Sequence, residues 1–206
     1  MGQRMFVAIT PPDEVREHLA DFLAPRVGMT WIDPAQWHLT LAFLASVPEH
    51  RIDELVERLE TAASRRHTCE LALVGAGSFP AAERAAVLWL GLHVDGRDAS
   101  GRDSLGAAET EVHRLAVNAR AAATKIGAPP DGQRFVPHLT VARPRRPIEA
   151  TKWLRVLDSY RGPTWELTEI DLVASYLGEG ARRRPRYETV ATIALGAPAR
   201  VQEDAL

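Results

Sequence analysis

A four-residue pattern, histidine–apolar–threonine–apolar, occurs twice in this chain. One copy places His38 two positions before Thr40, and the other places His138 two positions before Thr140. Both copies lie in short apolar runs that are typical of buried strands. Because side chains alternate between the two faces of a strand, each histidine points the same way as its threonine, and the apolar residues between them point into a core. Two such strands would build a symmetric polar floor.

Length and composition predict a single domain over residues 1–206 with a frayed tail at 197–206, since 206 residues can bury a sizeable core. The net charge of −2 gives no overall attraction for nucleic acid, so any anion site must come from local clustering. The lone cysteine, Cys69, excludes an internal disulfide and fits a reducing compartment. No secretory segment and no apolar run of about 20 residues is present, so we expect a cytoplasmic protein without a membrane span.

Apolar periodicity predicts an alternation of strands and helices. The expected strands cover residues 4–9, 37–43, 70–74, 85–94, 135–141, 167–176 and 187–195, and the expected helices lie between 10 and 25 and at 49–63, 107–126 and 148–157. The segment Gly75-Ala76-Gly77 predicts a turn, and residues 95–106 are predicted to form a surface loop. Each motif strand has a helix before it and after it, which indicates two related halves that divide near 75–80 or within 95–106.

The paired motif favours a shared ligand. A single strand histidine is usually structural, but burying two imidazoles and two hydroxyls without partners would cost on the order of 1–3 kcal/mol each. Zinc is a poor fit, because neither copy offers further ligands at the usual spacing. A serine or cysteine nucleophile and a glycine-rich phosphate loop lack their sequence signals as well.

Acid–base chemistry at phosphorus suits these residue types. Two histidines with ordinary pKa values of about 6.5 can divide the acid and base roles near neutral pH. Threonine hydroxyls can donate to phosphate oxygens where charge builds in the transition state, and an arginine can neutralise that charge. Arg143, three positions after Thr140, and Arg134, four before His138, are the candidates. This chemistry requires no metal and no cofactor.

With these signatures the chain resembles the 2H phosphoesterases, and specifically the RNA 2′,3′-cyclic phosphodiesterases, also called 2′-5′ RNA ligases. The similar segments are 4–9 with Pro12 and 14–16, 37–44, 75–80, 87–91, 134–143, and 175–177 with Gly180 and Tyr187. Ala45, where the family usually has glycine, and the long 95–106 segment are departures. The resemblance implies an α+β fold of two pseudo-symmetric lobes. Each lobe would be an antiparallel sheet with helices packed outside, around a central cleft that carries the two His-x-Thr motifs.

The resemblance also implies hydrolysis of an RNA terminal 2′,3′-cyclic phosphate to a 2′-phosphate. His38 would be the proton donor to the departing O3′, and His138 the proton acceptor from water. The residues that would bind the phosphate are Thr40, Thr140 and Arg143, and Arg134 is a further candidate because of its position near His138. The sequence by itself leaves open which histidine is the acid. We expect a monomer whose partner is an RNA end or a related small cyclic phosphate.

Two alternatives stay open at this point. One is a phosphodiesterase for another small substrate, such as a cyclic nucleotide, a 2′-5′-linked oligonucleotide or an ADP-ribose cyclic phosphate. The other is a non-catalytic module that binds RNA ends. The arginine-rich run 182–186, with arginines 143, 145 and 146, is either a basic rim for RNA or a solvated loop. We expect packing roles rather than base binding for Trp37, Trp89, Trp153 and Trp165.

Overall fold

The computed structural model describes residues 2–93, 107–130, 132, 134–180 and 184–196. The expected loop at 95–106, residues 182 and 183 of the arginine run and the expected tail at 197–206 lie outside this part of the chain. The described strands are β1 (Gly2–Ile9), β2 (Leu39–Pro48), β3 (Cys69–Phe79), β4 (Val87–His93), β5 (His138–Ala142), β6 (Trp165–Leu167), β7 (Glu169–Tyr176) and β8 (Arg186–Ala194). The α-helices are α1 (Asp13–Leu23), α2 (Ile52–Ala63), α3 (Ala107–Lys125) and α4 (Thr151–Asp158), and the short 3-10 helices are η1 (Pro34–Gln36), η2 (Glu49–Arg51) and η3 (Ala82–Arg84).

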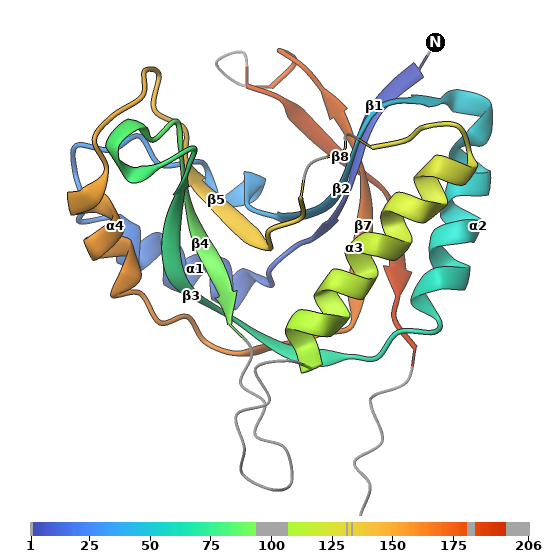
Figure 1. Cartoon of the computed structure of the whole chain (residues 1–206), viewed down its shortest axis with the longest axis horizontal. Coiled ribbons are helices and arrows are strands. Elements are labelled where there is room, and N and C mark those ends of the chain that lie inside the picture. The colour runs from blue at the N-terminus through green and yellow to red at the C-terminus, as the bar shows by residue number, and fades with distance from the viewer. Residues whose placement is uncertain (1, 94–106, 131, 133, 181–183, 197–206) are drawn as a thin grey trace, which may run out of the picture.

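The strands form one curled antiparallel sheet in the order β6-β3-β4-β5-β2-β1-β7-β8 (Figure 1). The two motif strands, β2 and β5, are neighbours at its centre and pair at Leu39 and Leu139. On either side lie β1 and β4, so the strand order mirrors itself about the β2–β5 contact. The α+β prediction with two similar lobes is confirmed, and the motif strands join the two lobes into a continuous sheet.

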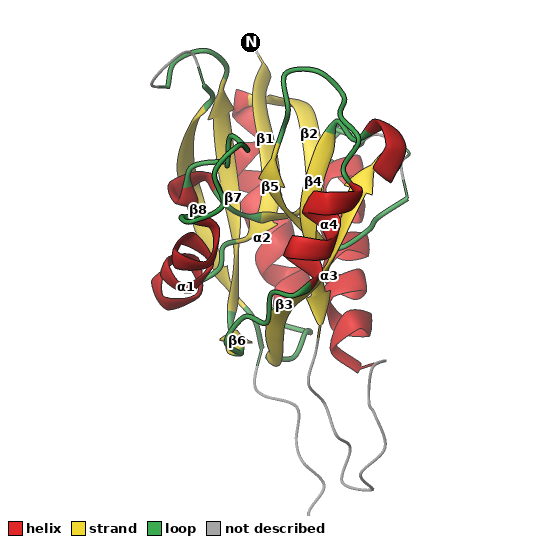
Figure 2. Cartoon of the chain, turned by 90° about the vertical axis from the view of Figure 1, so that its left-hand side faces the viewer, coloured by secondary structure: helices red, strands yellow, loops and turns green. Residues whose placement is uncertain are grey.

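The two halves of the chain exchange their outer strands. β3 follows β2 in sequence but pairs with β4, and β7 follows β5 but pairs with β1. Each lobe therefore contains strands from both halves of the chain, so the two lobes cannot be divided at a single point in the sequence. Figure 2 shows the helices against the sheet; α2 and α3 pack on each other, while α4 packs on β3 and β4. None of the described helices is long and apolar enough to cross a bilayer.

β1 shows how strand alternation builds the floor of the cleft. Met5, Val7 and Ile9 are fully buried in the main core. Phe6 and Ala8 point to the opposite face, where they form a second small cluster. Apolar residues on both faces are expected for a central strand, because both of its faces are covered. Phe6 is thereby placed beside the first motif.

The predicted turn at 75–77 is wrong, because β3 continues through these glycines to Phe79. Its pairing with β4 shifts register between Leu73 and Ala76. Gly75 adopts a positive φ of 77° at this shift, a conformation that glycine adopts without steric cost. The glycines thus mark a β-bulge within a strand, where the sequence pattern had suggested a strand end.

Gly77 lies directly across from Trp89 in the β3–β4 pair, and a Cβ at this position would lie 2.0 Å from the indole ring. We expect Gly77→Ala to displace the ring and lower the free energy of unfolding by about 1–3 kcal/mol, as other overpacked sites do. Urea unfolding measures this. Gly132→Ala is the control, since nothing lies within 4 Å of a Cβ at that exposed position. Equal stability of the two variants would contradict the prediction.

Candidate active site

The two motif histidines are held in the same way by the backbone that precedes each strand. His38 Nδ1 lies 2.8 Å from the carbonyl oxygen of Gln36, and His138 Nδ1 lies 2.7 Å from that of Val136. A carbonyl only accepts hydrogen bonds, so Nδ1 carries the proton in both rings. The Nε2 atom of each neutral imidazole is then left with a lone pair for chemistry.

Aromatic rings fix the plane of His38. Phe6 of β1 stacks on it with ring centroids 4.5 Å apart and an angle of 22° between the planes. Tyr187 of β8 meets it edge-on at 5.5 Å and 89°, and Tyr187 also contacts Phe6. The imidazole is thus held by rings from two strands, which limits its motion to a narrow range of rotamers.

His138 has an equivalent pair of rings from the other lobe. Phe79 of β3 contacts it edge-on at 5.1 Å, and Trp89 of β4 lies 5.9 Å away, tilted by 54°. The sequence analysis missed these aromatic residues as site residues and expected Trp89 only to pack. Alternation along the strands that flank each motif was the available signal, but using it requires knowing which strands pair.

Burial lowers the pKa of His38 and of His138 below the ordinary value. The backbone hydrogen bonds oppose this effect, whereas the positive charge of Arg143 lowers both pKa values further. His138 also lowers the pKa of His38, because the two rings repel each other when both are charged. The lowered pKa values favour the neutral form of both imidazoles near pH 7.

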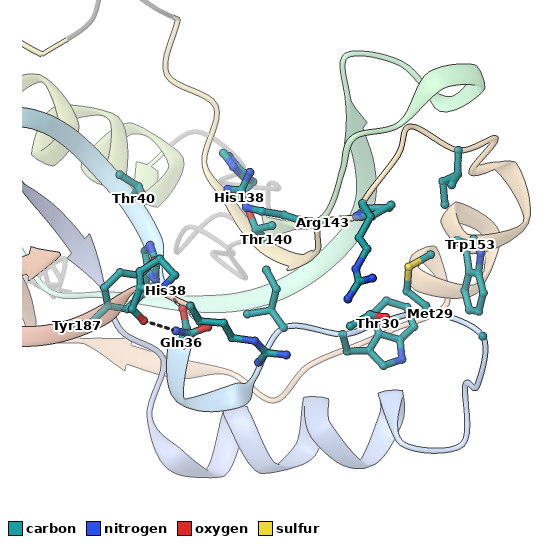
Figure 3. A pocket seen from close by; sticks show the side chains of 18 of the residues that line it. Met29, Thr30, Gln36, His38, Thr40, His138, Thr140, Arg143, Trp153 and Tyr187 are labelled. Carbon is teal, nitrogen blue, oxygen red and sulfur yellow. Dashed lines mark hydrogen bonds between the residues drawn. The ribbon is translucent and has the colours of Figure 1, made fainter. Parts of the chain in front are cut away.

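The histidines open into a cleft of about 870 Å³ (Figure 3). Its walls bring together five of the six predicted site residues, namely His38, Thr40, His138, Thr140 and Arg143. Arg134 is exposed and is not among the described residues that line the cleft.

Of the arginines suggested as a basic rim, Arg143, Arg145 and Arg184 line the cleft. Arg186 instead forms ion pairs with Glu179 and Glu188, at 3.1 and 2.9 Å. Among the described arginines of the run, Arg184 therefore contributes to a basic rim. The charge of Arg186 is instead neutralised by its ion pairs.

Gln36 and Tyr187 form the wall on the His38 side, and the sequence analysis did not single them out. Gln36 Nε2 donates a hydrogen bond of 2.8 Å to the carbonyl oxygen of Pro185, which ties η1 to the start of β8 (Figure 3). Burial raises the pKa of Tyr187, although Arg143 and Arg4 oppose the shift. Its hydroxyl is therefore protonated at neutral pH and can serve as a hydrogen-bond donor.

Cys69 is the other group that a nucleophilic mechanism would consider. It lies in β3, away from the residues that line the cleft, and burial raises its pKa to about 11. Within the described part of the chain, no group of three or more histidine, cysteine or acidic side chains is arranged to hold a metal ion. The reactive groups gathered in the cleft are imidazole, hydroxyl and guanidinium.

Comparisons with known proteins point in one direction. Residues 9–89, which include the first motif, match the family model described as LigT like Phosphoesterase. A protein of Aeropyrum pernix named RNA 2′,3′-cyclic phosphodiesterase is 30% identical over 178 residues, which cover 85% of this chain and 91% of that protein. One of the same name from Aquifex aeolicus is 29% identical over 131 residues, or 64% of this chain and 63% of the relative. The structure of E. coli LigT complexed with 3′-AMP matches with a TM-score of 0.71 at 27% identity, covering 95% of this chain and 99% of that one.

Proposed function

Because this chain belongs to the LigT-like phosphoesterases, we propose that it is an RNA 2′,3′-cyclic phosphodiesterase that opens a terminal cyclic phosphate to a 2′-phosphate. The relatives from Aeropyrum pernix and Aquifex aeolicus are named RNA 2′,3′-cyclic phosphodiesterase, and E. coli LigT has a structure in complex with 3′-AMP. One observation supports the proposal most strongly. Two imidazoles with the same tautomer share a cleft with two threonines and Arg143.

In the proposed reaction, water attacks phosphorus opposite the P–O3′ bond. His138 Nε2 accepts a proton from the water as the new P–O bond forms. The P–O3′ bond breaks, and His38 Nε2 donates its proton to O3′. The products are a 2′-phosphate and a free 3′-hydroxyl. The cycle leaves His138 protonated and His38 neutral, so exchange with solvent restores the starting state.

The proposed roles of the other residues follow from charge. Phosphorus gains a fifth oxygen in the transition state, so negative charge builds on the non-bridging oxygens. The hydroxyls of Thr40 and Thr140 donate to these oxygens, and the guanidinium of Arg143 compensates their charge. In this proposal one threonine lies on each side of the phosphate, because each comes from one of the two paired motif strands.

Protonation of His38 depends on the substrate in this account. Burial and Arg143 keep the pKa of His38 low in the free protein, which disfavours the acid form. A bound phosphate diester brings a negative charge next to the imidazole and raises that pKa. The acid is thus charged when the substrate is present.

We expect both histidines to titrate below about pH 6.5 in the free protein, the ordinary value for this side chain. Since neutral imidazole is favoured by burial, protonation requires a lower pH than in an unfolded chain. Addition of a nucleoside 2′-phosphate is expected to move both midpoints upward. Proton NMR of the imidazole Cε1–H signals, assigned with His38→Ala and His138→Ala, measures the midpoints. Midpoints above 6.5 in the free protein would contradict the assigned environment.

Activity is expected to persist in EDTA, because imidazoles move the protons and Arg143 compensates the charge. The measurement is the turnover rate before and after exhaustive treatment with the chelator. Loss of activity that a divalent cation restores would overturn this part of the mechanism.

The proposal as a whole is tested with a short RNA that ends in a 2′,3′-cyclic phosphate. Phosphorus NMR of the product distinguishes a 2′-phosphate from a 3′-phosphate. We expect the 2′-phosphate only. Cyclic nucleotides, 2′-5′-linked oligonucleotides and ADP-ribose cyclic phosphate are assayed in parallel. Turnover of one of these without turnover of the RNA would reassign the substrate, and binding without any turnover would favour the non-catalytic module.

A further inference from the structure

The cleft extends well beyond the groups that the reaction uses. Met29, Thr30 and Trp153 lie together at one end of it, and Arg143 lies between them and the histidines (Figure 3). A cleft of about 870 Å³ falls in the range that holds a whole small-molecule ligand, which is far more than one phosphate needs. A nucleotide whose phosphate lies at the histidines must place its base elsewhere in this space.

Trp153 packs against a second tryptophan, Trp31. Trp31 contacts it edge-on, with centroids 5.5 Å apart and planes at 86°. Trp31 Nε1 in turn donates to the carbonyl oxygen of Arg26 at 3.1 Å. The next residue, Ile32, donates its backbone N–H to Val141 of the second motif at 2.8 Å. The segment that supports Trp153 is thus anchored to the motif strand, so the distance from the indole to the phosphate site is fixed by the fold.

The described lining of the cleft includes a carboxylate as well as arginines 143, 145 and 184. Glu149, two residues before α4, lines the cleft, and its Oε1 accepts a hydrogen bond of 2.9 Å from the backbone N–H of Thr151. Hydrogen bonds from Thr151 hold the pKa of Glu149 below its ordinary value, so the carboxylate is charged at neutral pH. A carboxylate repels phosphate, whereas it accepts hydrogen bonds from the amino groups of a base.

We propose that Trp153 is the platform on which the terminal nucleobase of the substrate stacks, with Met29 beside it and Glu149 in the same cleft. This inference rests on the proposed function for its substrate, and it revises the expectation that Trp153 only packs. Aromatic platforms of this kind bind bases through their π-faces and tolerate different sequences. Trp153 therefore makes the enzyme discriminate between a nucleotide and a ribose phosphate that lacks a base.

The test compares the affinity for adenosine 2′-phosphate with that for ribose 2-phosphate, measured by calorimetry. The wild-type protein is expected to bind the nucleotide about 10- to 100-fold more tightly, as stacking on one aromatic ring provides. Trp153→Ala should abolish this preference and leave the affinity for ribose 2-phosphate unchanged, whereas Trp153→Phe should retain most of it. Trp165→Phe, in β6 outside the cleft, is the control.

Three results would overturn the proposal: no preference in the wild type, a preference that survives in Trp153→Ala, or equal loss of affinity for both ligands. If Trp153→Ala does not fold, as judged by thermal unfolding, Trp153→Leu fills the space without an aromatic face and must show the same loss of preference. The readout is binding, so it is independent of turnover. A preference that depends on Trp153 in a protein that leaves the cyclic phosphate of RNA intact would refute the proposed function and retain the base site.

Discussion

Replacing His138 by alanine is expected to lower kcat on an RNA 2′,3′-cyclic phosphate by about 10²- to 10⁴-fold, the contribution that a positioned general base or acid makes. The variant removes the group that takes the proton from water, while Thr140 and Arg143 still bind the phosphate. KM should therefore change much less than kcat. Initial rates over a range of substrate concentrations separate the two parameters.

The matched control is His50→Ala, because His50 is exposed in η2 and is not among the described residues that line the cleft. We expect this variant to retain wild-type kcat. Circular dichroism and thermal unfolding establish that His138→Ala keeps the fold. A folded His138→Ala protein that retains more than a tenth of the activity would show that another group serves as the base.

Replacing Arg143 by alanine is expected to lower kcat/KM by about 10²- to 10³-fold, similar to the loss of one preorganised donor at a developing oxyanion. Among the described residues, Arg143 is the arginine whose charge lowers the pKa of both motif histidines. Its removal should therefore also raise both imidazole midpoints, so the same variant gives two independent readouts. Steady-state kinetics and an NMR titration measure them.

Arg143→Lys keeps the charge but loses the planar donor pair, so it should restore the histidine midpoints and only part of the rate. Arg65→Ala, at an exposed position beyond α2, controls for a general loss of positive charge. If Arg143→Ala reduced the rate without moving either midpoint, its guanidinium would lie farther from the imidazoles than the structure indicates.

The sequence predicted the centre of the site well, because the relevant information is local. Alternation along a strand determines that His38 and Thr40 face the same side, and the same holds for His138 and Thr140. The structure places all four on one cleft. Most helices and strands also lie close to their predicted ranges, because the apolar residues of each recur with the spacing of a helix or a strand.

The surroundings of the site could not be predicted, since they depend on which strands become neighbours. Phe6 and Tyr187 reach His38 because β1 pairs with β2 and β7 positions β8. Nothing local in the sequence reveals that β4 pairs with β5 of the other half of the chain. That pairing brings Phe79, on the neighbouring strand β3, to His138, and the register shift between β3 and β4 makes the Gly75 region a bulge.

The central claim is that His38 is the general acid and His138 is the general base. A substrate with sulfur in place of the bridging O3′ tests this claim most directly. A thiolate leaves readily without a proton, because thiols have a pKa of about 8.5. On this substrate His38→Ala is predicted to recover most of the wild-type rate, whereas His138→Ala stays inactive because water still needs a base. Rescue of His138→Ala and not of His38→Ala would reverse the roles, and rescue of neither would contradict acid catalysis by His38.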